Sequence, residues 1–248
     1  MKRLAALILA LCLPVIVSAE PVVLDEPRTG TFFFPEDADE DHAVYMYRYS
    51  FPSVSGDTAF AEGVNTFFSD YLEDAAAFTV PINGESIEST DEVSTTDISS
   101  TVTCNTDSAF SVLVRSHSIM DGYEYESYSA YVFARSGPKE GLVIALPHLL
   151  GILEENETDT WLQDRQTAKA DKCVRDIIWE QIEQNSEGRT YLPDISYDLF
   201  QDMFFPEEDF YLDETGNPVF FVQPGILTPE EDGVLLFPVS LEFILDEI

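Results

Sequence analysis

The stretch YSFPSVSGDTAFAEGVNTFFSDYL, residues 49–72, joins the end of a strand to an amphipathic helix. The large apolar residues after Asp57 recur at spacings of three and four, which places Phe60, Val64, Phe67, Phe68, Tyr71 and Leu72 on one helical face. Asp57 or Thr58 can cap the start of this helix. Upstream, Val44 to Phe51 alternates large side chains with a period of two, the pattern of a half-buried strand. The stretch therefore predicts a strand, a turn and a helix.

Three further β-type segments follow this helix. They are Ile98 to Thr106, Ala109 to Ser116 and Tyr123 to Ala134, and short turns separate them. An antiparallel meander is the simplest arrangement of three consecutive strands with short turns. Residues 83–100, which precede the meander, are rich in serine, threonine and acids and predict a loop or a poorly hydrophobic edge strand.

The remaining chain alternates short strands with helices. The predicted elements are a strand at 141–145, a long amphipathic helix at 159–184, a short helix at 197–204, a hairpin at 210–222, a strand at 234–238 and a short helix at 241–245. There is no regular βαβ alternation and no internal repeat. We therefore predict an α+β fold with antiparallel sheets packed against two long helices.

The N-terminal segment MKRLAALILALCLPVIVSAEP has the order of a secretory signal. Lys2 and Arg3 precede an apolar run, and small residues precede Glu20. We predict cleavage after Ala19 and an extracytoplasmic location, either periplasmic or secreted. Cys12 would leave with the leader, because Leu11 before it does not fit a lipoprotein signal. The alternative is an uncleaved membrane anchor, which the short apolar run with its proline fits less well.

The chain is strongly acidic, with 47 acidic and 12 basic side chains and a formal net charge of −35. Such a field repels nucleic acid and anionic lipid head groups and attracts cationic partners or divalent metal ions. Nucleic-acid binding is therefore excluded, and a cationic protein or a cell-wall component is the expected partner. The alternative is that the charge only keeps an exported protein soluble. Residues 20–43, which include the acidic run from Glu36 to Asp41, predict an extended acidic arm.

Two cysteines, Cys104 and Cys173, remain after the predicted cleavage. An even number of cysteines in an oxidising compartment favours a disulfide between them. The alternative is a pair of buried free thiols. Neither cysteine lies in a CxxC motif or in a metal-ligand spacing, so redox catalysis is not expected.

Catalytic motifs are absent from the sequence. His42, His117 and His148 have no partner at the spacing of a zinc site, and no GxSxG, SxxK or phosphate-binding glycine loop occurs. Ser116-His117-Ser118 allows a hydrolase interpretation, but an exposed polar strand edge is the much commoner reason for such a sequence. We therefore expect a protein that is not an enzyme and that carries no cofactor.

Acidic runs and tyrosines are the remaining candidates for binding. Residues 37–41 have the opening spacing of a calcium loop, but His42 and Arg48 occupy the positions of the required glycine and glutamate. Weak calcium binding there or at residues 230–232 is one alternative, and a solvated acidic patch is the other. Tyr123, Tyr125, Tyr128, Tyr131 and Phe133 recur along a predicted strand. Tyr123, Tyr125 and Tyr128 could form a recognition face, whereas ordinary sheet packing is the second explanation.

Two segments resemble the RsiV-like family of extracytoplasmic domains of unknown function. Residues 210–244, FYLDETGNPVFFVQPGILTPEEDGVLLFPVSLEFI, are similar to the C-terminal end of that family, and residues 49–72 are similar to its opening strand, proline and helix. Asn65 stands where the family has a helix asparagine. Residues 120–125, MDGYEY, depart from the family's glycine-rich turn with its histidine, so no ligand contact carries over there.

The resemblance implies a two-part module whose C-terminal part is similar to a subdomain of the heat-shock-cognate ATPase fold. Family members include the sensor portion of an anti-sigma factor that binds lysozyme and modules attached to peptidoglycan deacetylases. On this basis residues 44–97 form an N-terminal α+β part and residues 98–248 form the RsiV-like part.

Three functions are compatible with these observations. The first is a non-enzymatic binding or sensing module of the cell envelope, for a cationic protein such as lysozyme or for a cell-wall component. The second is a cell-wall hydrolase or deacetylase with a cryptic site. The third is an acidic structural or weakly calcium-binding protein.

Overall fold

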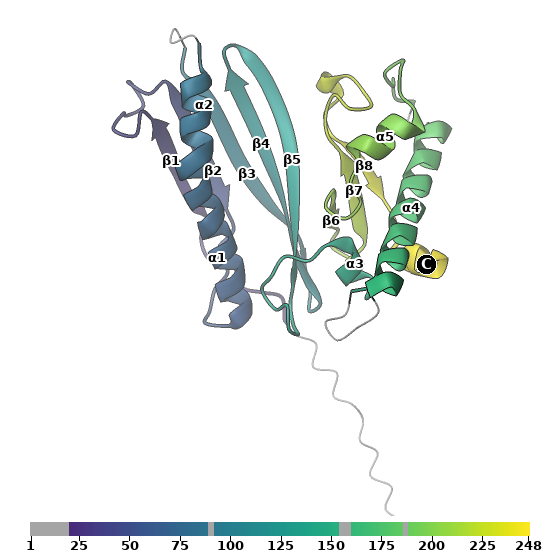
Figure 1. Cartoon of the computed structure of the whole chain (residues 1–248). Helices are drawn as coiled ribbons and strands as arrows, with labels where there is room; N and C mark the ends of the chain where they lie inside the picture. Colours follow the sequence, from purple (N-terminus) through teal and green to yellow (C-terminus); the bar gives the residue numbers. More distant parts are fainter. Residues whose placement is uncertain (1–19, 89–91, 154–159, 186–187) are drawn as a thin grey trace, which may run out of the picture.

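The computed structural model describes residues 20–88, 92–153, 160–185 and 188–248. It is an α+β fold with two β-sheets and several helices (Figure 1). The predicted leader, including Cys12, lies outside the described residues. None of the described helices combines the length and the apolar character needed to cross a bilayer.

The larger sheet has five strands in the order β1-β2-β3-β4-β5. The strands are β1 (Arg28–Phe34), β2 (Tyr45–Phe51), β3 (Ser94–Asn105), β4 (Ala109–Met120) and β5 (Tyr123–Ala134). Strands β3, β4 and β5 form the predicted antiparallel meander.

One pairing in this sheet corrects the prediction that all strands are antiparallel. Strands β2 and β3 are parallel, with Tyr45 opposite Ser94. The chain leaves β2, passes through the helices and returns to the same edge in the same direction, and such a crossover produces a parallel pair. The helical crossover consists of α1 (Ala59–Asp74), a π-helical turn (Ala75–Thr79) and α2 (Val80–Ser86).

The predicted acidic arm is also corrected in part. Residues 28–34 are not a free arm, because they form β1 and pair antiparallel with β2. Phe32 and Phe34 pack against the core of this sheet, which anchors the strand. The acidic residues 36–41 form the connection between β1 and β2 instead.

Helix α1 covers one face of the five-stranded sheet (Figure 1). Its predicted apolar face is the buried one, with Phe60, Val64, Phe68 and Leu72 at most 6% exposed. The ring of Phe68 stacks on Phe51 of β2 at a centroid distance of 4.9 Å. Full burial of one such ring stabilises the fold by roughly 1.5–3 kcal/mol. The sequence pattern therefore identifies the face that makes this core.

The second sheet has three strands in the order β6-β7-β8. The strands are β6 (Phe210–Leu212), β7 (Pro218–Val222) and β8 (Leu235–Pro238). The helices of this part are α3 (Leu146–Leu149), α4 (Thr160–Gln184), α5 (Tyr197–Met203) and α6 (Leu241–Glu247), with a 3₁₀ turn at Glu230–Asp232. Ala170, Val174, Ile178 and Ile182 are buried along one side of α4 and belong to the core of this sheet.

The two sheets lie next to each other, with β5 facing the strands of the smaller sheet (Figure 1). Ser111 of β4 is fully buried, and its Oγ accepts a hydrogen bond from the Leu212 amide of β6 at 3.0 Å. The predicted boundary between the two parts of the chain, between residues 97 and 98, falls inside strand β3. That division and the likeness to an ATPase subdomain stay predictions.

The strand predicted at 141–145 is not formed, and this segment contributes only an isolated bridge between Val143 and Phe133 of β5. This segment leads into α3, and it contributes one wall of the cleft described next.

Candidate functional site in the cleft between the sheets

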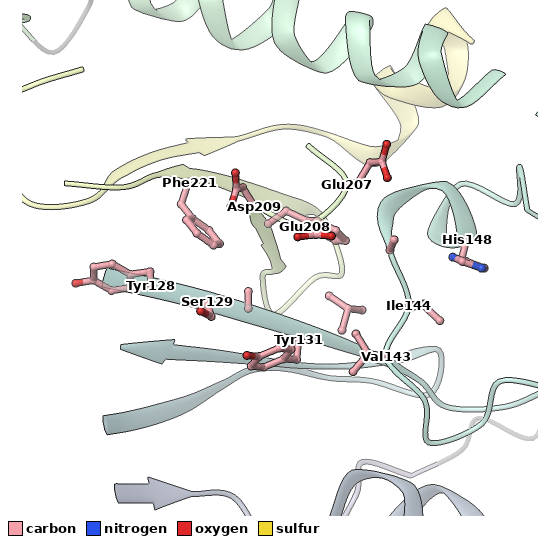
Figure 2. A pocket seen from close by; sticks show the side chains of 14 residues that line it. Tyr128, Ser129, Tyr131, Val143, Ile144, His148, Glu207, Glu208, Asp209 and Phe221 are labelled. Atoms are coloured by element: carbon pink, nitrogen blue, oxygen red, sulfur yellow. The ribbon is translucent and has the colours of Figure 1, made fainter. Parts of the chain in front are cut away.

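A cavity of about 480 Å³ lies between the outer edge of β5 and the smaller sheet (Figure 2). Three stretches of chain line it. They are residues 128–132 of β5, residues 143–145 with His148 of α3, and residues 207–210 with Phe221 of β7. The cavity therefore lies where the two sheets meet, which is a common place for a ligand to bind.

The floor of the cavity is the backbone of an edge strand. The amide of Tyr128 donates to Gln223 Oε1 at 2.9 Å, and its carbonyl accepts from Gln223 Nε2 at 2.7 Å. Farther along, the carbonyl of Val132 accepts from the Ile144 amide at 2.7 Å. Between these two points lies Ala130, whose outward amide and carbonyl have no hydrogen-bond partner among the described residues. The strand edge is thus bonded at both backbone groups of Tyr128 and at the carbonyl of Val132, and it is open at Ala130.

The opposite wall is acidic. Glu207, Glu208 and Asp209 are consecutive and precede β6. Figure 2 shows Glu208 and Asp209 across the cavity from β5. Burial raises the pKa of Asp209 to about 6, the neighbouring Glu208 charge adds to this, and a 2.8 Å hydrogen bond from the Phe205 amide opposes it. This wall presents carboxyl groups of which one is protonated readily near neutral pH.

A second carboxyl group with a raised pKa lies behind this wall. Burial and the adjacent Glu207 raise the pKa of Asp171 on α4 to about 6, and the charge of Arg175 opposes the shift. A nearby negative charge and burial both disfavour the charged form of Asp171. Glu207 therefore connects the cavity to a buried group on α4.

His148 lies at the far end of the cavity from Tyr128 (Figure 2). Burial, together with the charge of Lys139, lowers the pKa of this histidine, which favours the neutral ring. Its buried Nδ1 has no hydrogen-bond partner among the described residues. A neutral imidazole at this position could accept or donate one hydrogen bond to a ligand.

The structure does not bring the three predicted tyrosines together. Tyr123 and Tyr125 are 68% and 50% exposed near the tip of β5. They share the strand face of Tyr131, which packs on α1, because alternate residues point to the same side. Tyr128 has the other parity and lines the cavity, where its hydroxyl donates to Glu126. Tyr128 is thus the one predicted site tyrosine in the cleft.

The Ser116-His117-Ser118 sequence does not form a catalytic arrangement. Adjacent residues of β4 point to opposite faces, so His117 lies on the other side of the strand from both serines. His117 Nε2 is 2.7 Å from Glu124 Oε1 near the surface, and Ser118 Oγ is 2.8 Å from Thr96 Oγ1. The hydrolase interpretation of this sequence is therefore not supported by the geometry.

The acidic runs do not converge on a metal centre within the part of the chain that the structure describes. Asp39 accepts hydrogen bonds from the Asp41 amide at 3.2 Å and from His42, so it is used within its own turn. Residues 230–232 form an exposed 3₁₀ turn. Neither run gathers the several oxygen ligands that calcium needs.

The predicted disulfide between Cys104 and Cys173 is not formed in the structure, where both are free thiols. Cys104 Sγ is buried in β3, 3.8 Å from Thr106 Oγ1 and 3.9 Å from the Ala109 carbonyl. Cys173 lies one position before the inward-facing Val174 and lines a surface groove against α6. A step of one residue turns a helix by about 100°, which directs this thiol away from the core that holds Cys104.

Sequence reasoning did not identify Ala130, Gln223 or the acidic residues 207–209 as site residues. Ala130 and Gln223 carry no chemical signal of their own, since their roles depend on which strand lies at the edge. The run FFPEEDF, residues 204–210, contains a visible clue, because adjacent acids are flanked there by large aromatic residues.

The comparisons with known proteins concern the fold alone. No family model and no curated protein matches the sequence. Among solved structures, a DUF3298 family protein from Pseudomonas aeruginosa is similar with a TM-score of 0.52 and 10% identity, covering 92% of this chain and 94% of the other. A DUF3298 family member from Bacteroides fragilis is similar with a TM-score of 0.47 and 13% identity, covering 92% and 98%. This chain therefore has structural neighbours in a family of unknown function, and the likeness to the Pseudomonas protein extends over almost the whole of both chains.

Proposed function

We propose that this chain is a non-enzymatic binding or sensing module of the cell envelope, secreted or periplasmic, that takes a cationic partner in the cleft between its sheets. The observation that carries the proposal is the 480 Å³ cavity with Glu207, Glu208 and Asp209 along one wall. Carboxylates at a cleft attract a positively charged group, and the formal net charge of −35 strengthens this attraction at longer range.

A cationic protein such as a lysozyme is the partner to test first. The resemblance of residues 49–72 and 210–244 to RsiV-like domains supports this choice, since that family includes a sensor that binds lysozyme. A cationic cell-wall component is the alternative partner, because it would offer the same charge to the same wall.

The experiment is a calorimetric titration of the protein without residues 1–19 with a lysozyme, at low and at moderate salt. Saturable binding that survives moderate salt is expected, because a shaped site depends less on screened long-range attraction than a charged surface does. Binding that disappears at moderate salt would reduce the interaction to charge alone and would count against a specific module.

Two matched variants locate the contact. Glu208→Gln removes one charge from the cleft. Glu231→Gln removes one charge from an exposed 3₁₀ turn that does not line the cleft. We expect Glu208→Gln to weaken binding at least fivefold and Glu231→Gln to change it less than twofold. Equal effects of the two variants would exclude the cleft as the binding site.

One observation favours a second function, a cell-wall hydrolase. Asp209 has a pKa of about 6 and lines the cavity, and a carboxyl group with such a pKa can act as a general acid near neutral pH. Release of soluble fragments from purified peptidoglycan by the wild-type protein, and its loss in Asp209→Asn, would establish this activity. Absence of release would leave the binding module as the function.

A further inference from the structure

We propose that the ligand in the cleft is an extended peptide segment that adds to the edge of β5 and pairs with Ala130, with a basic side chain toward residues 207–209. This inference rests on the proposed binding function and names the ligand class for the same cleft. It follows from three observations: the direction of the Ala130 backbone groups, the pairing of the neighbouring Tyr128, and the charge of the opposite wall.

The first observation is that Ala130 points its amide and carbonyl into the cleft. In an edge strand, alternate residues direct both backbone groups toward the partner strand or away from it. Tyr128, Val132 and Ala134 all direct these groups away from β4, since their hydrogen bonds go to Gln223 and to residues 141–144. Ala130 has the same parity in an unbroken register with β4, so its groups point outward as well.

The second observation is that the outward N–H and C=O of one residue, Ala130, fit a peptide better than they fit a single amide group. The N–H and C=O of a single secondary amide point in opposite directions, so one acetamido group can satisfy only one of the two groups of Ala130. One residue of an extended peptide contributes an N–H and a C=O that point the same way and can exchange both hydrogen bonds. An extended peptide therefore fits Ala130 better than an N-acetylated sugar does.

The neighbouring residue shows this type of pairing within the protein itself. The carboxamide of Gln223 receives the Tyr128 amide at 2.9 Å and donates to the Tyr128 carbonyl at 2.7 Å, and thereby imitates one residue of an added strand. A peptide at Ala130 would extend the same edge by one position. Addition of a strand to a sheet edge is an established mode of peptide recognition.

The third observation is the negative charge of the wall opposite β5. Side chains of the added peptide would lie between β5 and the wall formed by Glu207, Glu208 and Asp209. A lysine or arginine there would pair with these carboxylates, whereas an acidic side chain would be repelled. The peptide is therefore expected to be basic.

The probe is a synthetic tripeptide, Ala-Lys-Ala, blocked as an acetyl and an N-methylamide at its ends. Its central lysine pairs with Ala130, so the lysine side chain lies on the same face as that of Ala130, toward the acidic wall. Titration into ¹⁵N-labelled protein should shift the amide resonance of Ala130 and give a saturable dissociation constant. A second peptide, N-methylated at its central residue, lacks the donor for the Ala130 carbonyl and should bind at least fivefold more weakly. Equal binding of the two peptides would overturn the pairing.

Variants at Ala130 test the same contact from the protein side. Ala130→Pro removes the outward N–H without removing a ladder hydrogen bond, a substitution that edge strands accept. Ala130→Ser keeps the N–H and is the matched control. We expect at least fivefold weaker peptide binding for the proline variant and less than twofold for the serine variant. If the proline variant does not fold, the N-methylated peptide and the Ala130 resonance decide the question alone.

Two further outcomes separate this inference from the proposed function. If a lysozyme binds and Glu208→Gln weakens that binding while neither peptide binds, the cleft takes a cation but not an added strand, and the inference is overturned. Binding of an N-acetylglucosamine disaccharide with the same Ala130 shift and equal affinity would also overturn it, in favour of a sugar. If neither a lysozyme nor the peptide binds, both proposals fail.

Discussion

Two carboxyl groups with raised pKa values, Asp171 and Asp209, make the stability of this protein depend on pH. Asp209 has a pKa of about 6 in the folded state, against an ordinary value of 3.8, because burial disfavours its charged form. The folded state therefore binds this proton more tightly than the unfolded state does. The resulting stabilisation is complete below about pH 4 and is lost as the pH rises through 6.

Asp209→Asn should remove the part of this dependence that Asp209 contributes, while Asp171 still contributes its own part. Asparagine keeps an acceptor for the Phe205 amide but cannot ionise, so we expect the variant to be more stable than wild type at pH 7.5 by on the order of 1 kcal/mol, after allowance for partial solvent screening. At pH 4 the two proteins should be equally stable. Chemical denaturation at both pH values measures the difference.

The control for this prediction is Asp202→Asn, on the exposed side of α5. It removes the same charge from a strongly acidic protein without removing a buried carboxyl group. If both variants stabilised the protein equally at pH 7.5, general charge repulsion would be the cause and the assignment to Asp209 would be wrong.

Asn65 of α1 forms two hydrogen bonds with the segment that follows β2. Its Oδ1 accepts from the Val54 amide at 2.9 Å and its Nδ2 donates to the Val54 carbonyl at 2.8 Å. Asn65→Ala leaves both groups of a buried valine without this partner, so we expect a loss of about 1–3 kcal/mol in the free energy of unfolding.

Asn65→Asp should be similarly destabilising. The aspartate still accepts from the Val54 amide, but it replaces the donor to the Val54 carbonyl by a second carboxylate oxygen, which that carbonyl repels. Thr66→Ala, on the exposed side of the same helix, is expected to change the stability by less than about 0.5 kcal/mol. Thermal and urea unfolding of the three variants check these values. A tolerated Asn65→Ala would show that the Val54 groups find water instead.

At the scale of elements, α1 approaches the segment before α3 so closely that only glycine fits. A Cβ on Gly63 would lie 2.5 Å from the carbonyl oxygen of Gly141 and 2.7 Å from its Cα. Gly141 itself has a φ of 78° and faces the backbone of α1. Because both contacts involve backbone, no change of rotamer can relieve them.

Gly63→Ala therefore tests whether this contact outweighs helix propensity. Alanine gains about 1 kcal/mol over glycine within a helix. Overpacking against fixed backbone costs about 1–3 kcal/mol and more where nothing can move, so we expect a net loss of stability. Asp70→Ala, on the exposed side of α1, should gain propensity without a clash. A stabilised Gly63→Ala variant would mean that the segment at Gly141 moves away freely.

Elements with a strong local pattern could be predicted from the sequence. The helix that begins near Thr58 and the strand from Tyr123 to Ala134 lie where their periodicity placed them. Strand β1 was missed because phenylalanines beside an acidic run have no clear alternation. The parallel pairing of β2 with β3 depends on how α1 and α2 return the chain, which is not a local property.

The cleft could be predicted only in part for the same reason. The tyrosine pattern of β5 was visible, and the odd spacing of Tyr123 and Tyr128 in one strand places them on opposite faces. Which of these faces meets the cleft depends on the side that α1 covers. Ala130 has no distinguishing side chain, and it gains its role only because β5 lies at a sheet edge beside residues 207–209.

For the whole molecule, the relation between the two sheets depends on a few buried polar contacts as well as on apolar packing. Ser111 of β4 is 0% exposed and its Oγ receives hydrogen bonds from Leu212 of β6 and from Thr103 of β3, both at 3.0 Å. A buried amide that loses its acceptor costs about 1–3 kcal/mol, more than the mean value of a hydrogen bond. The contact also holds β6 against β4, and so it positions the acidic wall that precedes β6.

Ser111→Ala should therefore weaken both the fold and the cleft. We expect a loss of about 1–3 kcal/mol in unfolding free energy and faster hydrogen exchange of the Leu212 amide, while Ser127→Ala, on the exposed surface of β5, should have little effect. Because residues 207–209 directly precede β6, binding of the cationic partner should weaken in Ser111→Ala as well. Urea denaturation, amide exchange and the calorimetric titration measure the three quantities. If stability fell while binding and Leu212 exchange stayed unchanged, the serine would support the core of β4 without coupling the two sheets.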